Sequence, residues 1–435
     1  MRLRNPHFLL YCSMFGRRST SALCGSACGL TAVVAPITAV AQTQPQGSEP
    51  LRDTPTLARI IQLAVEKAPD VVIGRSVLRS SEASYVGARL WPVQNPYVEL
   101  LASNTQRTGS HSTLFTGTAW LPFEVTGQRG ARLNEAKAFV SIHQFELERA
   151  RAQARAIGMK AWGRAVVEAE RIRTLGELVR SAEAESKAFS LRRDAGDATE
   201  RDAQLAEMER ARHLLLVEES RASLESAMGD LQRITGKAWA VPNEPSMRVE
   251  TILYRYDPRE VAAQSPFVRA FSAEAAYFAQ VDEKWAREAA GPVSLMLSGG
   301  HGTTGETVLG AGVAWSLPTF RRFQGERAKA QAERERSLVQ AGAIQREIET
   351  RLATIVRELD AVRRAISVVD KQALPAARAA RAAAEQMFQM GKIDILSVLV
   401  SRRDEVLLRL RNLDLVEQEW ALVADWVELS GVMPQ

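Results

Sequence analysis

The stretch IQREIETRLATIVRELDAVRRAISVV, residues 344–369, decides the fold class of this 435-residue chain. Its apolar residues recur at spacings of three and four, the pattern of a helix with one apolar face. They are Ile344, Ile348, Leu352, Ile355, Leu359, Val362, Ile366 and Val369. The opposite face is charged, with Arg346, Glu347, Arg351, Arg357, Glu358 and Arg364. The pattern predicts a coiled-coil-like helix that is packed on one side and solvated on the other.

This helix is predicted to extend far beyond the quoted stretch. Residues 323–390 contain a single proline, Pro375, and residues 128–193 contain none. At 1.5 Å per residue, each run would form a helix about 100 Å long, far more than a globular core requires. The chain is also rich in Ala, Glu, Arg and Leu and poor in aromatic residues, a balance that favours long helices.

The two long runs belong to two copies of one repeating unit. Gly196 and Gly391 lie 195 residues apart, and Gly236 and Gly431 have the same spacing. Two further landmarks are Ala68-Pro69 with Ser265-Pro266, and the triplets Gly127-Gln128-Arg129 with Gly325-Glu326-Arg327, which are 198 residues apart. Four landmarks in one order predict an internal duplication.

The duplication predicts the domain organisation. We expect a signal peptide over residues 1–41, a first repeat over 42–237, a linker over 238–265 and a second repeat over 266–435. Each repeat should contain a helix of about 20 residues, a β-hairpin, a very long helix, a glycine turn and a final helix. The hairpins are expected at residues 97–121 and 293–316.

The predicted strands have the character of membrane strands. In the second repeat, Leu309, Ala311, Val313 and Trp315 alternate with small residues, and no charge interrupts the run. Strands of about 9–11 residues with one apolar face suit a membrane sheet. Trp91, Trp120 and Trp315 fall near strand ends, where the aromatic residues of a membrane interface are expected.

The N-terminus has the pattern of a secretory signal. Basic residues precede an apolar stretch that ends in Ala39-Val40-Ala41, a small-residue cleavage pattern. All three cysteines precede Ala41, so the predicted mature chain has no disulfide and no thiolate metal site. Cys28 as a lipid anchor is disfavoured, because Gly25 stands where such a sequence has Leu. Removal of the signal leaves 52 basic and 51 acidic residues, a balance that does not indicate nucleic-acid binding.

The mature sequence has no run of 18 apolar residues, so membrane entry would depend on the strands. Four strands cannot close a membrane sheet alone, and open edges in lipid would leave backbone groups unpaired. The sequence therefore predicts a homotrimer. Its fold class is mainly α with a small β part: a long-helix α-barrel, and four β-strands per chain completing a 12-stranded trimeric membrane β-barrel.

In this order and spacing, the elements resemble the TolC family of outer-membrane efflux proteins. The resemblance is carried by the repeat, the segments at 91–96 and 317–325, and the Phe388–Leu396 segment. The Pro122–Arg129 and Pro318–Gly325 segments look most like the cobalt–zinc–cadmium branch, which serves heavy-metal cation pumps. The resemblance implies a homotrimer in the outer membrane with its helical barrel in the periplasm. It also implies two partners, a periplasmic adaptor (membrane fusion) protein and an inner-membrane RND-type pump.

The resemblance also implies a gate at the turns of the long helices, Gly196 and Gly391. Family members often carry acidic residues six and nine positions after the second turn glycine, where this chain has Ser397 and Val400. The gate candidates are therefore Asp202 and Asp394, the acids nearest the turns, together with Ser397, Val400 and Arg402. Arg201, Lys392 and Arg403 are further candidate charge partners. The alternative for both aspartates is a role in capping their helices.

No chemistry-bearing motif supports an enzyme, and the sequence indicates neither a cofactor nor a metal cluster. Its histidines are not closely paired, and a phosphate-binding glycine loop is absent. A drug-efflux duct or a type I protein-secretion duct remains an alternative to metal efflux. A periplasmic coiled-coil scaffold is the alternative from a different class, although it leaves the charge-free strands unexplained.

Overall fold

The computed structural model describes residues 56–91, 94–107, 109–242 and 253–433, and the predicted signal peptide lies outside this range. The first half contains α1 (Leu57–Lys67), α2 (Pro69–Ala88), β1 (Tyr97–Arg107), β2 (Ser110–Phe123), α3 (Gln128–Asp194) and α4 (Glu200–Thr235). The second half contains η1 (Leu253–Arg255), α5 (Pro258–Gln264), α6 (Pro266–Glu288), β3 (Val293–Gly302), β4 (Thr307–Trp315), α7 (Gln324–Val368), η2 (Val369–Ala373), α8 (Leu374–Gln389) and α9 (Ile395–Ser430). The predicted mainly helical fold with a small four-stranded sheet is confirmed.

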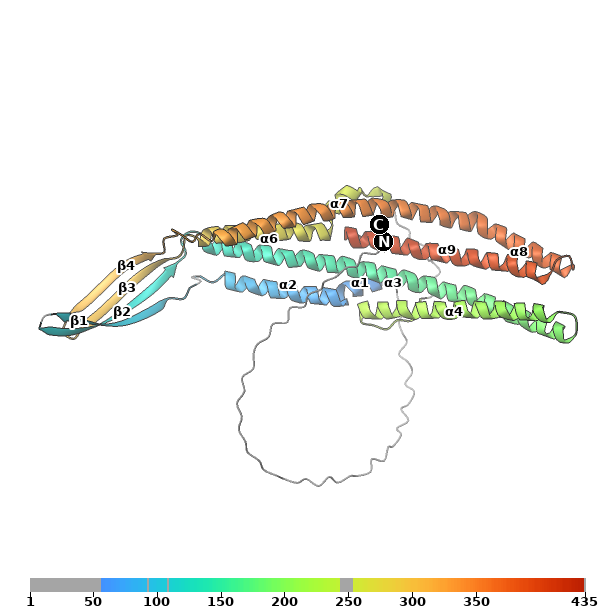
Figure 1. The fold of residues 1–435 in the computed structure, drawn as a ribbon, viewed down its shortest axis with the longest axis horizontal. Helices are drawn as coiled ribbons and strands as arrows, with labels where there is room; N and C mark the ends of the chain where they lie inside the picture. The colour runs from blue at the N-terminus through green and yellow to red at the C-terminus, as the bar shows by residue number, and fades with distance from the viewer. Residues whose placement is uncertain (1–55, 92–93, 108, 243–252, 434–435) are drawn as a thin grey trace, which may run out of the picture. The chain divides into compact units, whose positions relative to one another are not determined.

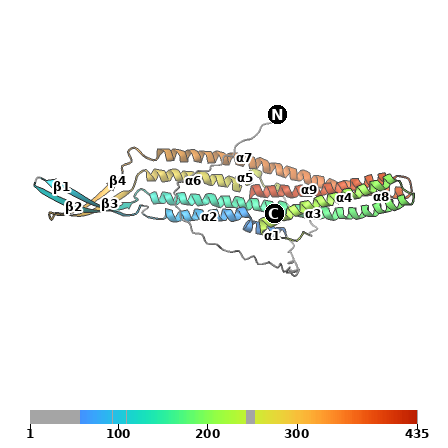
Figure 2. The ribbon, with the colours of Figure 1, turned by 60° about the horizontal axis from the view of Figure 1, so that its bottom comes forward.

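The long helices run side by side, and the strands lie beyond one end of them (Figures 1 and 2). None of the helices in the described ranges is long and apolar enough to cross a membrane. Their main core contains side chains from both halves, including Ile60 of α1, Trp162 of α3, Leu352 of α7 and Trp426 of α9. The apolar stripe of residues 344–369 is buried from Ile348 to Val369, and Ile344 is partly buried.

The second long helix is interrupted, whereas α3 is continuous over 67 residues. A π-turn, η2, separates α7 from α8, and Pro375 is the second residue of α8. Proline has no N–H, so it cannot donate the helical bond to the carbonyl four residues earlier. The Leu374 N–H donates to the Val369 carbonyl, a wider bond that carries the chain past the proline.

The four strands form one antiparallel sheet in the order β1-β2-β3-β4. Its register places apolar side chains from every strand on one face, where most are exposed: Val98, Leu100, Phe115, Leu297, Leu309 and Val313. The other face carries polar residues such as Glu99, Thr116, Thr118 and Ser298. The sheet has one apolar surface, and its two edge strands are β1 and β4.

Two features differ from the sequence interpretation. Short helices α1 and α5 precede α2 and α6, and α5 lies within the stretch expected to be a linker. The two Gly-x-Arg triplets are not structurally equivalent. The residue that precedes α3 is Gly127, whereas the residue that precedes α7 is Phe323, so the matched triplets are two residues out of step.

Candidate functional site

The two hairpin turns have the same backbone geometry. Gly196 and Gly391 have φ values of 84° and 68°, a left-handed conformation that glycine adopts without strain. The Asp197 N–H donates to the Arg192 carbonyl at 2.7 Å, and the Lys392 N–H donates to the Met387 carbonyl at 2.9 Å. These bonds satisfy carbonyl groups at the ends of α3 and α8, so each glycine reverses the chain where the gate was predicted.

Asp202 and Asp394 cap their helices. An Asp202 carboxylate oxygen accepts from the Thr199 N–H at 3.2 Å and from the Thr199 hydroxyl at 2.7 Å, and the Thr199 hydroxyl oxygen accepts from the Asp202 N–H. An Asp394 carboxylate oxygen accepts from the Ser397 hydroxyl at 2.6 Å and from the Ser397 backbone N–H at 3.1 Å. Hydrogen bonds from the Ser397 side chain, then from its backbone, lower the pKa of Asp394. Both carboxylates therefore have a local structural role.

The other candidates near the second turn are exposed. Ser397 is engaged with Asp394, and Val400 has 38% of its surface exposed. The charge of Arg201 makes a minor contribution to the lowered pKa of Asp394. Arg403 is paired with its neighbour Asp404 at 4.0 Å.

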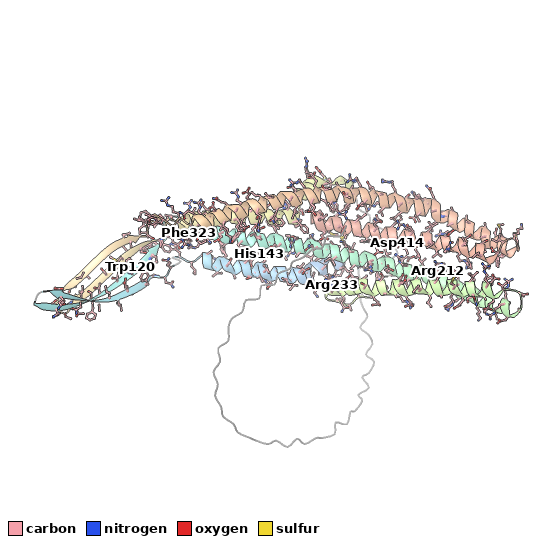
Figure 3. The ribbon with its side chains drawn as sticks, viewed as in Figure 1. Trp120, His143, Arg212, Arg233, Phe323 and Asp414 are labelled. Atoms are coloured by element: carbon pink, nitrogen blue, oxygen red, sulfur yellow. The ribbon has the colours of Figure 1, made fainter. Side chains whose placement is uncertain are left out.

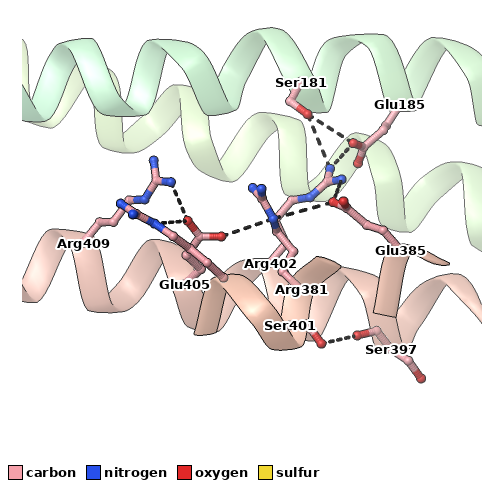
Figure 4. A network of polar contacts seen from close by, with 10 residues as sticks. Ser181, Glu185, Arg381, Glu385, Ser397, Ser401, Arg402, Glu405 and Arg409 are labelled. Carbon is pink, nitrogen blue, oxygen red and sulfur yellow. Dashed lines mark hydrogen bonds and ion pairs between the residues drawn. The ribbon is translucent and has the colours of Figure 1, made fainter. Parts of the chain in front are cut away.

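Arg402 instead joins three helices. Its guanidinium contacts Glu185 of α3 and lies 2.9 Å from a carboxylate oxygen of Glu385 on α8 (Figure 4). Burial acts to lower the pKa of Arg402, but hydrogen bonds and charges from the two glutamates outweigh it and raise that pKa. We call Arg402, Glu185 and Glu385 the three-helix ion pair. The structure thus pairs Arg402 with these glutamates, rather than with Asp202 or Asp394.

The glutamate partners were missed at the sequence level. Glu185 lies eleven residues before Gly196, and Arg402 lies eleven residues after Gly391. Equal distances from the turns place both at about 16 Å along their hairpins. That symmetry was a usable signal, but it does not reveal which helices face each other.

A small apolar cluster also joins the two turns. Phe189, Ala203 and Ala206 of the first hairpin are buried there, and Phe388 and Ile395 of the second pack against them. The two hairpins are therefore held together by an apolar contact near the turns and by an ion pair further along.

A second ionic cluster surrounds Glu405 of α9, whose side chain is only 2% exposed. Arg409 contacts it, and Arg381 and Arg378 lie 3.2 and 3.6 Å away. Arg381 also lies 3.8 Å from Glu385. The two clusters form one continuous network along α8 and α9 (Figure 4).

The three tryptophans lie near the helical end of the sheet but differ in orientation. Trp315 is 55% exposed and shares the face of Leu309 and Val313. Trp120 lies within the sheet (Figure 3). The strand register places it on the polar face, where its ring stacks against that of Tyr97 with 5.9 Å between the centroids. Trp91 is 54% exposed and contacts Phe123. An interfacial role stays a prediction, and the geometry favours it for Trp315 and Trp91 over Trp120.

The long helices thus have the four-stranded sheet at one end and the two turns, which are joined by apolar and ionic contacts, at the other. Among the described residues, no group of three or more His, Cys, Asp or Glu side chains is arranged to hold a metal ion. The prominent polar groups are ion pairs between helices, which can hold a conformation but are not arranged as a catalytic centre.

No family model matches the chain. The cobalt-zinc-cadmium resistance protein CzcC of Cupriavidus metallidurans is 26% identical over 375 residues, which cover 84% of this chain and 87% of that protein. Among solved structures, CusC has a TM-score of 0.71 at 12% identity, covering 89% of this chain and 94% of CusC. The outer-membrane protein VceC of Vibrio cholerae has a TM-score of 0.67 at 17% identity, covering 86% of this chain and 96% of VceC.

The open-state outer-membrane channel MtrE of Neisseria gonorrhoeae has a TM-score of 0.65 at 15% identity, covering 87% of this chain and 89% of MtrE. These structural likenesses establish the fold, and the proteins that share it are channels rather than enzymes. Together with the sequence relationship to CzcC, they confirm the predicted resemblance of the chain to the TolC family of outer-membrane efflux channels.

Proposed function

We propose that the chain is the outer-membrane duct of a tripartite system that exports heavy-metal cations, with cobalt, nickel, zinc or cadmium as cargo. The observation that carries this proposal is the relationship to CzcC over most of both chains. The duct would take its cargo through a periplasmic adaptor protein and an inner-membrane RND-type pump. A wide duct needs no metal ligands of its own, because selection of the cation belongs to the pump.

The sheet supports a homotrimeric assembly. Strands β1 and β4 are its edges, and an exposed apolar face extends between them. Unpaired backbone groups at such edges are costly in lipid. Pairing of β4 in one copy with β1 of the next removes both edges, and three copies close the sheet.

The cargo is tested by deleting the gene and measuring growth inhibition by cobalt, nickel, zinc and cadmium salts, and by dyes, detergents and antibiotics. Metal export predicts that at least one metal becomes several-fold more toxic. Complementation with the wild-type gene should restore resistance. Sensitivity to organic toxicants alone would establish a drug duct, and loss of a secreted protein would establish a type I secretion duct.

Within this function, the joined turns form the gate and Arg402 is its main closing contact. Opening by separation of the hairpins must break the three-helix ion pair, since Glu185 and Arg402 belong to different hairpins. The aspartates are secondary, because their carboxylates are occupied by capping bonds.

The gate is tested by single-channel recording in planar bilayers. Loss of a partly buried ion pair worth about 1.4 kcal/mol changes the closed-to-open ratio about tenfold, so Arg402→Ala should raise the open fraction by that factor. Arg403→Ala is the matched control, because Arg403 is the adjacent residue and pairs only locally. An equal open fraction for Arg402→Ala, Arg403→Ala and wild type would exclude Arg402 from the gate.

A further inference from the structure

The segments that join the sheet to the long helices differ strongly between the two repeats. Residues 124–127 connect β2 to α3, whereas the connection from β4 to α7 takes twice that length, residues 316–323. We call these the short junction and the long junction. They occupy equivalent places in the duplicated fold, so the additional four residues belong to the second repeat alone.

The short junction is tied to the rest of the protein. The Gln128 side chain is buried and donates to the Gly291 carbonyl at 3.1 Å. The Thr126 hydroxyl donates to the Arg287 carbonyl at 3.3 Å, and Glu124 pairs with Arg132 at 2.9 Å. Its polar groups therefore hold it against α3 and α6.

The long junction is held by its own bonds. Gln324 is the structural counterpart of Gln128, but its side chain donates to the Phe320 carbonyl at 3.0 Å. The Arg322 side chain donates to the Pro318 carbonyl at 2.9 Å. These contacts hold the junction in one shape through bonds within its own segment, and they leave Leu317 and Phe320 exposed.

Phe323 anchors the base of this junction in a strained conformation. Its φ of 54° is left-handed, which glycine adopts at the equivalent Gly127 and which costs other residues about 1–3 kcal/mol. Phe323 lies where the sheet meets the long helices (Figure 3). Its ring centroid lies 4.9 Å from that of Trp285, and the Arg321 guanidinium lies over the Phe323 ring at 5.2 Å from its centroid. This stacking fixes the direction in which the preceding residues leave the helix.

The result is an apolar tip beside two cations. Phe320 is 92% exposed and Leu317 is 63% exposed, although large apolar side chains are costly in water. Arg321 is 77% exposed at the side chain and pairs with Glu326 of α7 at 3.0 Å, and Arg322 is also exposed. The tip begins two residues after Trp315, the end of the sheet's apolar face.

The geometry points to a lipid-anchoring role: the long junction docks on the periplasmic leaflet of the outer membrane, with Phe320 and Leu317 among the upper acyl chains and Arg321 and Arg322 on phospholipid phosphates. Continuity with the apolar face of the sheet places the junction at the boundary of lipid and water. Arginine is suited to phosphate, and an aromatic side chain is favoured at this depth. The anchor rests on the proposed insertion of the sheet into the bilayer.

Depth measurements test this placement. Nitroxide labels are attached at Phe320→Cys, Leu309→Cys and Glu347→Cys in full chains whose Cys12, Cys24 and Cys28 are serine, reconstituted into vesicles of phosphatidylethanolamine and phosphatidylglycerol. Collision rates are measured with oxygen, which partitions into lipid, and with a nickel chelate, which stays in water. The label at 309 should be in lipid, the label at 347 in water and the label at 320 at intermediate depth.

Each outcome has a distinct meaning. A label at 309 in lipid with a label at 320 as accessible to nickel as 347 would overturn the anchor alone. Protection of 320 from both reagents would also overturn it, because a neighbouring copy would then cover the junction. A label at 309 in water would instead contradict the proposed insertion of the sheet.

The arginines are tested by the retention of phosphatidylglycerol. Each cation near an anionic surface is worth about a fivefold change in affinity. The double variant Arg321→Gln/Arg322→Gln should lower affinity for this lipid at least about fivefold, as measured by native mass spectrometry. The control Arg346→Gln/Arg364→Gln removes two exposed arginines from α7 and should have no effect. Equal retention by both variants would overturn phosphate binding.

Discussion

The two helical hairpins, α3–α4 and α8–α9, have similar turns and packing but differ in the polar residue that each one buries: a histidine in α4 and a glutamate in α9. Each has a glycine turn, and each ends at a left-handed glycine, Gly236 or Gly431. In α4, buried positions at seven-residue spacing include Ala206, His213 and Ser220, and in α9 Val398 is followed by Glu405. Each hairpin therefore has a polar group in its packed seam, a device that can fix the register of paired helices.

The two polar groups are compensated differently. Glu405 has arginines on three sides, whereas the Nδ1 atom of His213 is buried without a hydrogen-bond partner. In the second hairpin, arginine side chains balance the charge of the buried glutamate. In the first hairpin, burial lowers the pKa of His213 and so favours its uncharged form. The π-turn before α8 also makes the second hairpin the less regular of the two.

The largest expected effect comes from the contact that links the first hairpin's α3 to the second hairpin's α9. A Cβ added at Gly163 would lie 2.5 Å from the Trp420 ring, a rigid and buried neighbour. Gly163→Ala should lower the free energy of unfolding by about 3 kcal/mol, the upper range for overpacking. Thermal unfolding measures the change.

Gly229→Ala is its matched control in α4, because a Cβ there meets nothing within 4 Å. Removal of an unconstrained helical glycine should instead stabilise the chain by about 0.5–1 kcal/mol. The same sign of change for both variants would contradict the packing assignment.

The sequence predicted these long helices, the buried stripe of α7 and both hairpins, because periodicity and proline placement act locally. It did not predict α1 and α5, since each is short and runs directly into a proline-led helix. It also did not predict that Phe323 is the structural equivalent of Gly127. The two repeats were aligned by matching Gly127 with Gly325, which is two residues out of register with the helix starts. The partners of Arg402 required knowledge of which faces of three helices meet, which depends on tertiary packing.

The second expected effect concerns the charge in the second hairpin. Glu405→Ala would leave Arg378, Arg381 and Arg409 close together without their shared carboxylate. We expect a loss of about 2 kcal/mol, below that of a fully buried pair because these arginines can turn toward water. Glu405→Leu should recover much of this loss by filling the seam. Unchanged unfolding for Glu405→Ala would show that the cluster does not stabilise the second hairpin.

The third effect distinguishes the helix cap at the start of α9 from the one at the start of α4. Asp394 is the residue that precedes α9 and caps it, so Asp394→Ala should cost about 1 kcal/mol. In the first hairpin Thr199 remains as the cap when Asp202→Ala removes its reciprocal partner, and about half that cost is expected. Urea unfolding compares the two, and a larger loss for Asp202→Ala would reverse the assignment. Neither variant should raise the open fraction of the channel as much as Arg402→Ala.

The smallest effect, from a single titrating group, is a pH dependence confined to the first hairpin. Burial is the main cause of the lowered pKa of His213. Arg212 and Arg402 also lower it, and Glu209 and Glu185 oppose them. In the unfolded chain the same histidine has its ordinary pKa of 6.5. As the pH falls through 6.5, the unfolded chain binds a proton that the folded hairpin excludes, so stability decreases. The decrease ends below the lowered pKa, where both states are protonated.

His213→Gln should remove this part of the pH dependence of stability, measured as the shift in Tm between pH 7.5 and pH 5.5 (about the ordinary histidine pKa ± 1 unit). An identical shift in wild type and His213→Gln would show that His213 does not make the first hairpin the pH-sensitive one.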